Sequence, residues 1–254
     1  MAAASPQGRF TDGAARLSGR VLVNTEAYGK HLLHDYGDGV VLHVHLGLYG
    51  KFSDGPGSAP APVGEIRLRL WNTAHWLDLR GPAACQLLDP PEVAALLARL
   101  GPDPLREDAS PDAAWNAIRR SDRPLLALLM DQSIVAGAGL IYATEALFRA
   151  GLPPTTPGRR LRPKQWAALW ADLRTLMRAG VAEGRIDTVH NVHTPEAMGR
   201  APRVDRHGGE VYVYRRTGQP CLVCGTPVRT ATISNRNAYW CPGCQRTGAR
   251  SQAT

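Results

Sequence analysis

The chain has 254 residues, with 30 Lys and Arg against 22 Asp and Glu, so its formal net charge is +8 at pH 7. This length is enough for two or three modest domains with buried cores. No apolar run approaches the roughly 18 residues of a membrane span, and the first ten residues lack the basic and apolar regions of a signal peptide. The sequence therefore argues against a membrane protein and predicts a soluble, cytoplasmic one. Its positive charge favours a polyanionic partner such as nucleic acid, the alternative being a basic protein that binds none.

The first hundred residues have the pattern of a β-sandwich or flattened barrel. Two β-rich runs flank the turn Gly37-Asp38-Gly39, whose glycines accept positive φ at little cost. In the second run Leu42, Val44 and Leu46 alternate with His43 and His45, which predicts an apolar face and a polar face. Further strands are predicted over 65–71 and 76–79.

Helical signals follow from residue 90 onward. The segments are PPEVAALLARL, which Gly101 and Pro102 follow, then SPDAAWNAIRRSD, RPLLALLMDQ, GLIYATEALFRAG and KQWAALWADLRTLMRAG. The last has an apolar stripe, which predicts core packing, and Gly180 is predicted to follow its end. The stripe consists of Trp166, Leu169, Trp170, Leu173, Leu176 and Met177. Residues 184–209 are expected to form a mobile irregular loop, and EVYVYRR at 210–216 a strand.

Four of the five cysteines form two CxxC pairs, Cys221 with Cys224 and Cys241 with Cys244. A hairpin between two such pairs brings four thiolates to one metal, and four thiolates leave no open position for water. The pattern predicts one structural zinc ion, with a redox role for the pairs as the alternative. Cys85 stands alone and is either a small buried residue or a reactive thiol.

The loop between the cysteine pairs contains arginines and no acidic residue. We expect strands at 229–233 and 238–240, with Asn235-Arg236-Asn237 at the tip. From Arg215 to Thr254 there are six arginines and no Asp or Glu. Arg236 is therefore predicted to contact phosphate, the alternative being a solvated surface arginine.

Several stretches together resemble the formamidopyrimidine-DNA glycosylase and endonuclease VIII family of base-excision repair enzymes, and most of all its actinobacterial endonuclease VIII type. In chain order they are SPQGRF at 5–10, GKHLLH at 29–34, HVHLGLYG at 43–50, DLRGP at 78–82, LGPDPL at 100–105, LLMDQSIVAGAG at 128–139, YATEALF at 142–148, PCLVCG and YWCPGCQ. They follow the family's order over nearly the whole chain.

The resemblance implies an α+β multidomain fold with DNA bound in the cleft between its domains. The implied domains are an incomplete N-terminal β-sandwich at 1–104, a helix-two-turn-helix domain at 105–209, a zinc finger at 210–247 and a tail at 248–254. It also implies excision of an oxidised base from duplex DNA and cleavage of the strand at the abasic site. The partner is damaged double-stranded DNA, with no membrane and no nucleotide cofactor, and the protein is expected to be a nucleoid-associated monomer.

The family's functional residues map onto positions of this sequence. Lys30 matches the lysine with a role in β-elimination, and Arg236 matches the arginine assigned to δ-elimination and phosphate binding. Leu48 and Tyr49 lie where the family fills the gap left by the extruded nucleotide. The other expected DNA contacts are His45, Arg80, Arg99, Gly137, Gly139 and Leu140. The simpler alternatives are solvated charges for Lys30 and exposed strand histidines for His43 and His45.

Two positions depart from the family's pattern. Family members begin with a proline whose amine attacks the sugar, followed by a glutamate, whereas this chain opens on Met1-Ala2-Ala3. That predicts either a start inside the first domain or a paralogue without lyase chemistry. Leu140 replaces an asparagine that donates to a phosphate, so weaker DNA binding is expected, unless Leu140 simply packs against Leu129 or Phe148.

The sequence leaves three functional hypotheses. The first is a DNA glycosylase and abasic-site lyase whose present chain is impaired in chemistry because the nucleophile is absent. The second is a catalytically inert protein that binds damaged DNA. The third is a zinc-ribbon nucleic-acid protein without a preference for damage.

Overall fold

The computed structural model describes residues 1–205 and 208–246, and the predicted tail at 248–254 lies outside them. The chain forms two compact units, Met1–Arg99 and the part that begins at Leu100. Among the described residues no helix is both long enough and apolar enough to cross a membrane.

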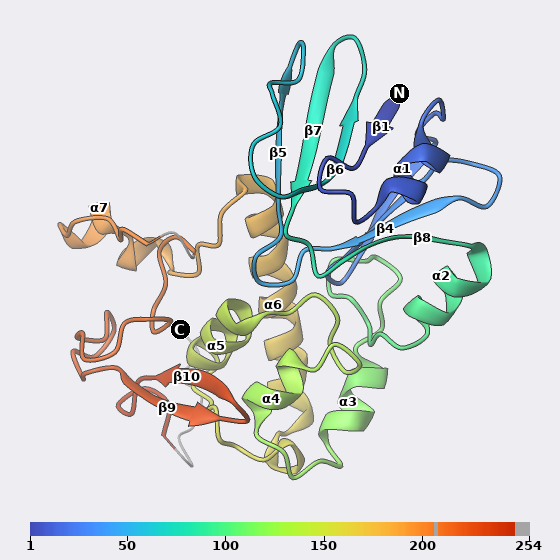
Figure 1. Cartoon of the computed structure of the whole chain (residues 1–254). Coiled ribbons are helices and arrows are strands. Elements are labelled where there is room, and N and C mark those ends of the chain that lie inside the picture. Colours follow the sequence, from blue (N-terminus) through green and yellow to red (C-terminus); the bar gives the residue numbers. More distant parts are fainter. Residues whose placement is uncertain (206–207, 247–254) are drawn as a thin grey trace. The chain divides into compact units, whose positions relative to one another are not determined.

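The first unit contains two antiparallel sheets of four strands each (Figure 1). Their orders are β1-β6-β7-β5 and β2-β3-β4-β8. The elements of this unit are β1 (Ala2–Ala4), α1 (Thr11–Leu17), β2 (Asn24–Tyr28), β3 (His31–Asp35), β4 (Val41–His45), β5 (Lys51–Pro56), β6 (Ile66–Trp71), β7 (His75–Arg80), β8 (Ala84–Leu88) and α2 (Pro90–Leu97). Leu42 and Val44 of one sheet share a core with Leu68 and Leu79 of the other, so the predicted sandwich is confirmed.

The hairpin of β3 and β4 forms as predicted around Gly37, Asp38 and Gly39, all three with positive φ. Its histidine face differs from the prediction, because His43 is only 3% exposed. Helix α1 was not predicted. It is short, but Leu17 is fully buried in the sandwich core. Gly13 leaves room for the ring of Phe10, since a Cβ there would lie 2.2 Å from it.

The second unit is helical and ends in a β-hairpin. Its elements are α3 (Asp112–Ile118), α4 (Leu125–Met130), α5 (Leu140–Arg149), α6 (Pro163–Glu183), α7 (Pro195–Met198), β9 (Arg229–Ile233) and β10 (Arg236–Trp240), with 3-10 turns at Gly158–Arg160 and Asn191–His193. The predicted stripe of α6 is buried, and most of it packs with α4 and α5 in one core (Figure 1). Ala238 of β10 belongs to the same core, so the hairpin is anchored on the helices.

The predicted end of helix α6 was wrong. Helix α6 does not end before Gly180 but runs on to Glu183, with Gly184 as a left-handed cap at φ 63°. Gly180 is needed for close packing instead, because a Cβ there would lie 1.9 Å from the hydroxyl oxygen of Tyr142.

Residues 210–216 form no strand. The N–H groups of Tyr212, Val213 and Tyr214 donate to the carboxylate of Glu145 rather than to a neighbouring strand, at 2.6, 2.9 and 2.8 Å. The segment 184–209, which was expected to be an irregular loop, contains α7 and the 3-10 turn at Asn191–His193.

Candidate DNA interface and metal centre

The four predicted cysteine ligands converge at the base of the β9–β10 hairpin. Their sulfur atoms all lie within 4.8 Å of one another, with 3.8 Å between Cys221 and Cys244 and 3.4 Å between Cys224 and Cys241. A disulfide needs about 2.05 Å between sulfurs, whereas four sulfurs about 2.3 Å from a tetrahedral zinc lie about 3.8 Å apart. The donor set therefore fits zinc.

The two turns that present these sulfurs depend on glycines. In the first, the Gly225 N–H donates to the Cys221 carbonyl at 2.9 Å, and Gly225 has a φ of 72°. In the second, a Cβ on Gly243 would lie 2.8 Å from the sulfur of Cys224. Both glycines therefore keep the sulfur shell compact.

Gln245 links this shell to the helical core and was not identified from the sequence. Its side-chain oxygen accepts from the Cys241 N–H at 2.9 Å, and its amide nitrogen donates to the Leu152 carbonyl at 2.8 Å. The side chain is buried. Its position directly after the second CxxC pair was the available signal.

The hairpin turn holds two residues, Ser234 and Asn235, whose φ values are 48° and 60°. Positive φ at both positions is typical of a type I′ turn, which matches the twist of the strands. Arg236 is thus the first residue of β10, paired with Ile233, and not the middle of the tip as predicted.

Arg236 is exposed, and among the described residues no hydrogen bond or ion pair holds its side chain. It borders a surface groove of about 190 Å³ together with Arg123, Met130 and Asp131. The Arg123 guanidinium lies 2.9 Å from the carboxylate of Asp131. Arg123 is therefore already paired with a carboxylate, whereas Arg236 is available to bind an anion.

The start of α5 presents the predicted Gly137, Gly139 and Leu140. The Gly137 N–H already donates to the side chain of Gln132 at 3.0 Å, and Gln132 in turn donates to the Ala138 carbonyl at 2.9 Å. Gly139 is the N-cap residue of α5, and Leu140 packs on the helical core. The core on which Leu140 packs includes Leu129, which supports the packing alternative, while a contact with Leu129 itself and the phosphate contact of the glycines stay predictions.

In the first unit three histidines lie in a row across β3 and β4. His31 stacks on His43 and His45 with ring centroids 5.1 and 5.0 Å apart, and its Nδ1 lies 2.8 Å from Nε2 of His43. Lys30 precedes this row, in the turn between β2 and β3. His43 is buried, which contradicts the alternative of two exposed strand histidines.

Burial and the charges around this row lower the pKa values of two of the histidines. Burial, followed by the neighbouring His31, His45 and Arg99, lowers the pKa of His43 to about 4. Burial also lowers the pKa of His31, with further contributions from His45, Arg99 and Lys30. His45, Arg99 and Lys30 all lie close enough to His31 to act on it electrostatically, and their contacts with DNA stay predictions.

The connection between β4 and β5 exposes two large apolar side chains, Leu48 at 83% and Tyr49 at 84%. The connection is tight, because a Cβ on Gly47 would lie 2.8 Å from the Cβ of Ala83. Exposure of this kind typically marks an interaction site.

Arg80 is tied into the sandwich. It lies 3.0 Å from the buried Asp78 and donates to the Ser53 hydroxyl at 2.5 Å. Asp78 also accepts from Arg69 at 2.6 and 2.9 Å. Burial alone would raise the pKa of Asp78, but the two arginines lower it. The structure therefore gives Arg80 a structural role, and its DNA contact stays a prediction.

Two family profiles match parts of the second unit. Residues 100–191 match the formamidopyrimidine-DNA glycosylase H2TH domain. Residues 218–247 match the zinc finger found in FPG and IleRS, so the cysteine cluster is a zinc-binding site of that type.

Whole-chain comparisons give the same family. The chain is 48% identical over 248 residues to endonuclease 8 1 of Mycobacterium tuberculosis (strain ATCC 25618 / H37Rv), covering 95% of this chain and 90% of that protein. It is 34% identical to the formamidopyrimidine-DNA glycosylase of Geobacter sulfurreducens, covering 91% and 84%.

The fold agrees with solved structures. Lactococcus lactis FPG in complex with DNA that contains FAPY-dG superimposes with a TM-score of 0.78 at 21% identity, covering 97% of this chain and 92% of that one. At this identity the match concerns the fold. Together with the two sequence relatives, it shows that the chain belongs to the formamidopyrimidine-DNA glycosylase and endonuclease VIII family of DNA glycosylases and AP lyases.

Proposed function

We propose that this protein recognises oxidised bases and abasic sites in duplex DNA and belongs to base-excision repair as a glycosylase with abasic-site lyase activity. The observation that carries the proposal is Arg236, an exposed cation held at the start of β10 by a hairpin that a four-cysteine centre anchors. Its place matches the family's phosphate-binding arginine, and the relatives named above support the substrate class.

The proposed roles are divided between the two units. In the first unit, Lys30 assists β-elimination, and His45 and Arg99 contact phosphate near it. In the second unit, Arg236 binds phosphate and assists δ-elimination. The backbone at the start of α5, around Gly137, Gly139 and Leu140, contributes weakly, because the Gly137 N–H already has an acceptor.

Leu48 and Tyr49 are proposed to fill the space left by the extruded nucleotide. Unstacking a base costs a few kcal/mol, and an apolar side chain inserted into the duplex offsets part of that cost. Two apolar side chains with more than four fifths of their surface exposed suit this role. Arg80 supports this region through Asp78 and Ser53.

We also propose one zinc ion per chain, held by Cys221, Cys224, Cys241 and Cys244. Zinc with four thiolates supplies structure and no reactive water. The protein is proposed to act as a monomer without a nucleotide cofactor.

Binding to abasic-site DNA tests the recognition step. We expect fluorescence anisotropy to show at least roughly tenfold tighter binding to a duplex with an abasic-site analogue than to an intact duplex. Replacing both Leu48 and Tyr49 with Ala should remove most of this preference. Val181→Ala, another exposed apolar residue, is the matched control. Equal affinity for both duplexes would contradict the proposal and favour a zinc-ribbon protein without damage preference.

Borohydride trapping on an abasic-site duplex tests the chemistry. An abasic-site lyase forms a Schiff base between one of its amines and the sugar, and borohydride reduces this intermediate to a stable covalent adduct. An adduct that disappears in Lys30→Gln would assign the amine to Lys30. Specific binding with neither adduct nor incision would favour the second candidate, an inert damaged-DNA-binding protein.

A further inference from the structure

The segment between α7 and the zinc-binding hairpin encloses a polar pocket of about 350 Å³, separate from the groove beside Arg236. Four of its lining residues are arginines, and two are carboxylates. The charged residues of the lining are Arg200, Arg203, Arg215, Arg216, Asp205 and Glu210. The lining therefore has two more positive than negative charges.

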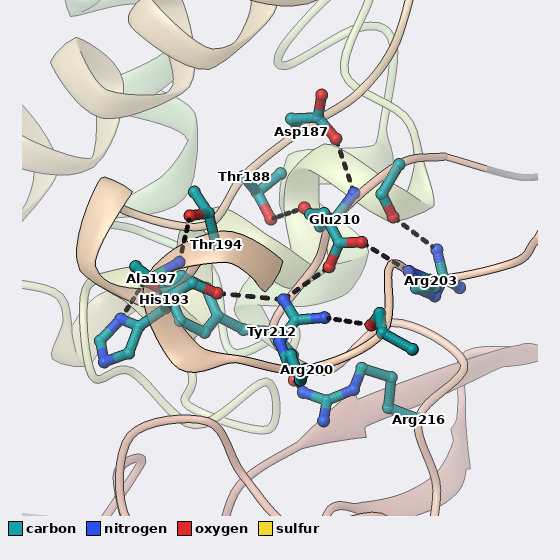
Figure 2. Close-up of polar contacts among 12 residues, drawn as sticks. Asp187, Thr188, His193, Thr194, Ala197, Arg200, Arg203, Glu210, Tyr212 and Arg216 are labelled. Carbon is teal, nitrogen blue, oxygen red and sulfur yellow. Dashed lines mark hydrogen bonds and ion pairs between the residues drawn. The ribbon is translucent and has the colours of Figure 1, made fainter.

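Both carboxylates are already engaged by arginines, and Figure 2 shows the contacts of Glu210 with Arg200 and Arg203. Glu210 accepts from the Arg200 guanidinium at 2.6 Å and from the Arg203 backbone N–H at 2.6 Å. Asp205 lies 2.7 Å from Arg203 and 3.8 Å from Arg215. These contacts fix the arginine side chains before any ligand arrives, which lowers the cost of ordering them on binding.

The excess positive charge lies partly in the interior. Arg216 is only 7% exposed, and its hydrogen bonds go to neutral oxygens, namely the carbonyls of Tyr212 and Pro220 and the side chain of Gln219. The Nε of Arg200 is buried and has no partner. Among the described residues no carboxylate is hydrogen-bonded to the Arg216 guanidinium, although Glu145 interacts with it electrostatically, and an anion in the pocket would further offset the cost of burying this charge.

We propose that this pocket, lined by Arg200, Arg203, Arg215 and Arg216, is a binding site for a phosphate group. Guanidinium groups match phosphate oxygens in geometry and charge, and phosphate carries the one to two negative charges that the lining lacks. The phosphate comes either from the DNA backbone or from free inorganic phosphate. A site for backbone phosphate rests on the proposed function and adds a DNA contact to it. A site for inorganic phosphate is independent of the proposed function.

Val204 allows a test that leaves the internal contacts intact. It lines the pocket and is 99% exposed, so its replacement disturbs no packing. Phosphorus NMR at low ionic strength should show saturable binding of inorganic phosphate to the full chain. Val204→Glu should weaken it roughly twofold to fourfold relative to Val204→Gln, and Val204→Lys should strengthen it. Val181→Glu, which changes the net charge equally at an exposed valine outside the lining, should have a smaller effect.

Removal of one lining charge gives a second measurement. Arg200, Arg203 and Arg215 form ion pairs in the lining of the pocket, and Arg215 has the most exposed side chain of the three. Arg215→Gln should weaken phosphate binding roughly threefold to tenfold. The inference is overturned if inorganic phosphate does not bind saturably, or if Val204→Glu and Arg215→Gln bind it as tightly as their references.

Duplex DNA then distinguishes the two sources. If the backbone supplies the phosphate, Val204→Glu weakens duplex binding relative to both Val204→Gln and Val181→Glu. If only inorganic phosphate binding changes, the site takes free phosphate. A lack of preference for abasic-site DNA in the parent protein would refute the proposed function and leave the phosphate measurement valid.

Discussion

Glu145 is a buried carboxylate that holds several segments of the second unit together. It accepts from the Thr188 hydroxyl at 2.7 Å and from the N–H groups of Tyr212, Val213 and Tyr214. Glu145→Gln replaces one acceptor oxygen by a donor that faces other donors, so we expect a loss of about 2–4 kcal/mol in the free energy of unfolding. Urea denaturation measures it. Glu183→Gln, at an exposed residue of α6, should change stability by less than about 0.5 kcal/mol.

His43 makes stability depend on pH. Its pKa in the folded protein, about 4, lies below the unfolded value of about 6.5, so the unfolded chain binds more protons between these values. The contribution of a neutral His43 is therefore complete above pH 6.5 and is lost as the pH falls towards 4. We expect this loss to be on the order of 1–3 kcal/mol. The loss is obtained from urea denaturation midpoints of the parent and of His43→Gln, measured between pH 4 and pH 6.5 and compared at each pH. Parallel curves for the two proteins would contradict it.

At the scale of elements, local sequence patterns correctly predicted the features that are determined by residues close to one another in the sequence. The Gly37-Asp38-Gly39 turn, the stripe of α6 and the two CxxC turns all follow from local spacing, and all formed. Residues 210–216 have the alternation of a strand, but their N–H groups are taken by Glu145, more than sixty residues earlier. A partner so distant leaves no local signal.

In the candidate site, too, local sequence patterns identified some residues and missed others. The cysteine ligands were evident from spacing, and the phosphate contact of Arg236 was predicted from a loop with arginines and no acidic residue. The roles of Lys30 and Arg236 in elimination came only from resemblance to a family. Gln132 was missed, since a glutamine that bonds backbone groups has no distinctive sequence pattern, and Gln245 was missed although it directly follows the second CxxC pair. The burial of His43 was also missed, because period-two alternation shows which residues share a face but not what covers that face.

The zinc-binding hairpin should lose its order without metal. Four thiolates brought within 4.8 Å of one another repel unless a cation or protons neutralise them, so the hairpin needs the metal in addition to its apolar contacts with the helices. We expect chelation, or Cys244→Ser, to raise amide hydrogen exchange throughout β9 and β10 and to weaken binding to abasic-site DNA at least roughly tenfold. Cys85→Ala is the control, because Cys85 packs in the sandwich of the first unit. Unchanged exchange in β10 after verified zinc removal would refute a structural metal.

At the scale of the whole molecule, the net charge of +8 predicts DNA binding that falls steeply with salt, since each phosphate contact releases counterions. Comparison of Arg236→Ala with Arg178→Ala distinguishes the effect of net charge from that of a specific phosphate contact, because both variants lose one positive charge. Arg178 is an exposed arginine of α6. If Arg236 binds a phosphate, its removal should lower the slope of log K against log salt by about one and weaken binding to abasic-site DNA, while Arg178→Ala leaves the slope nearly unchanged. Anisotropy titrations over a salt series measure both. Equal slopes for the two variants would mean that Arg236 acts only through the overall charge, and its assigned role in phosphate binding would then be wrong.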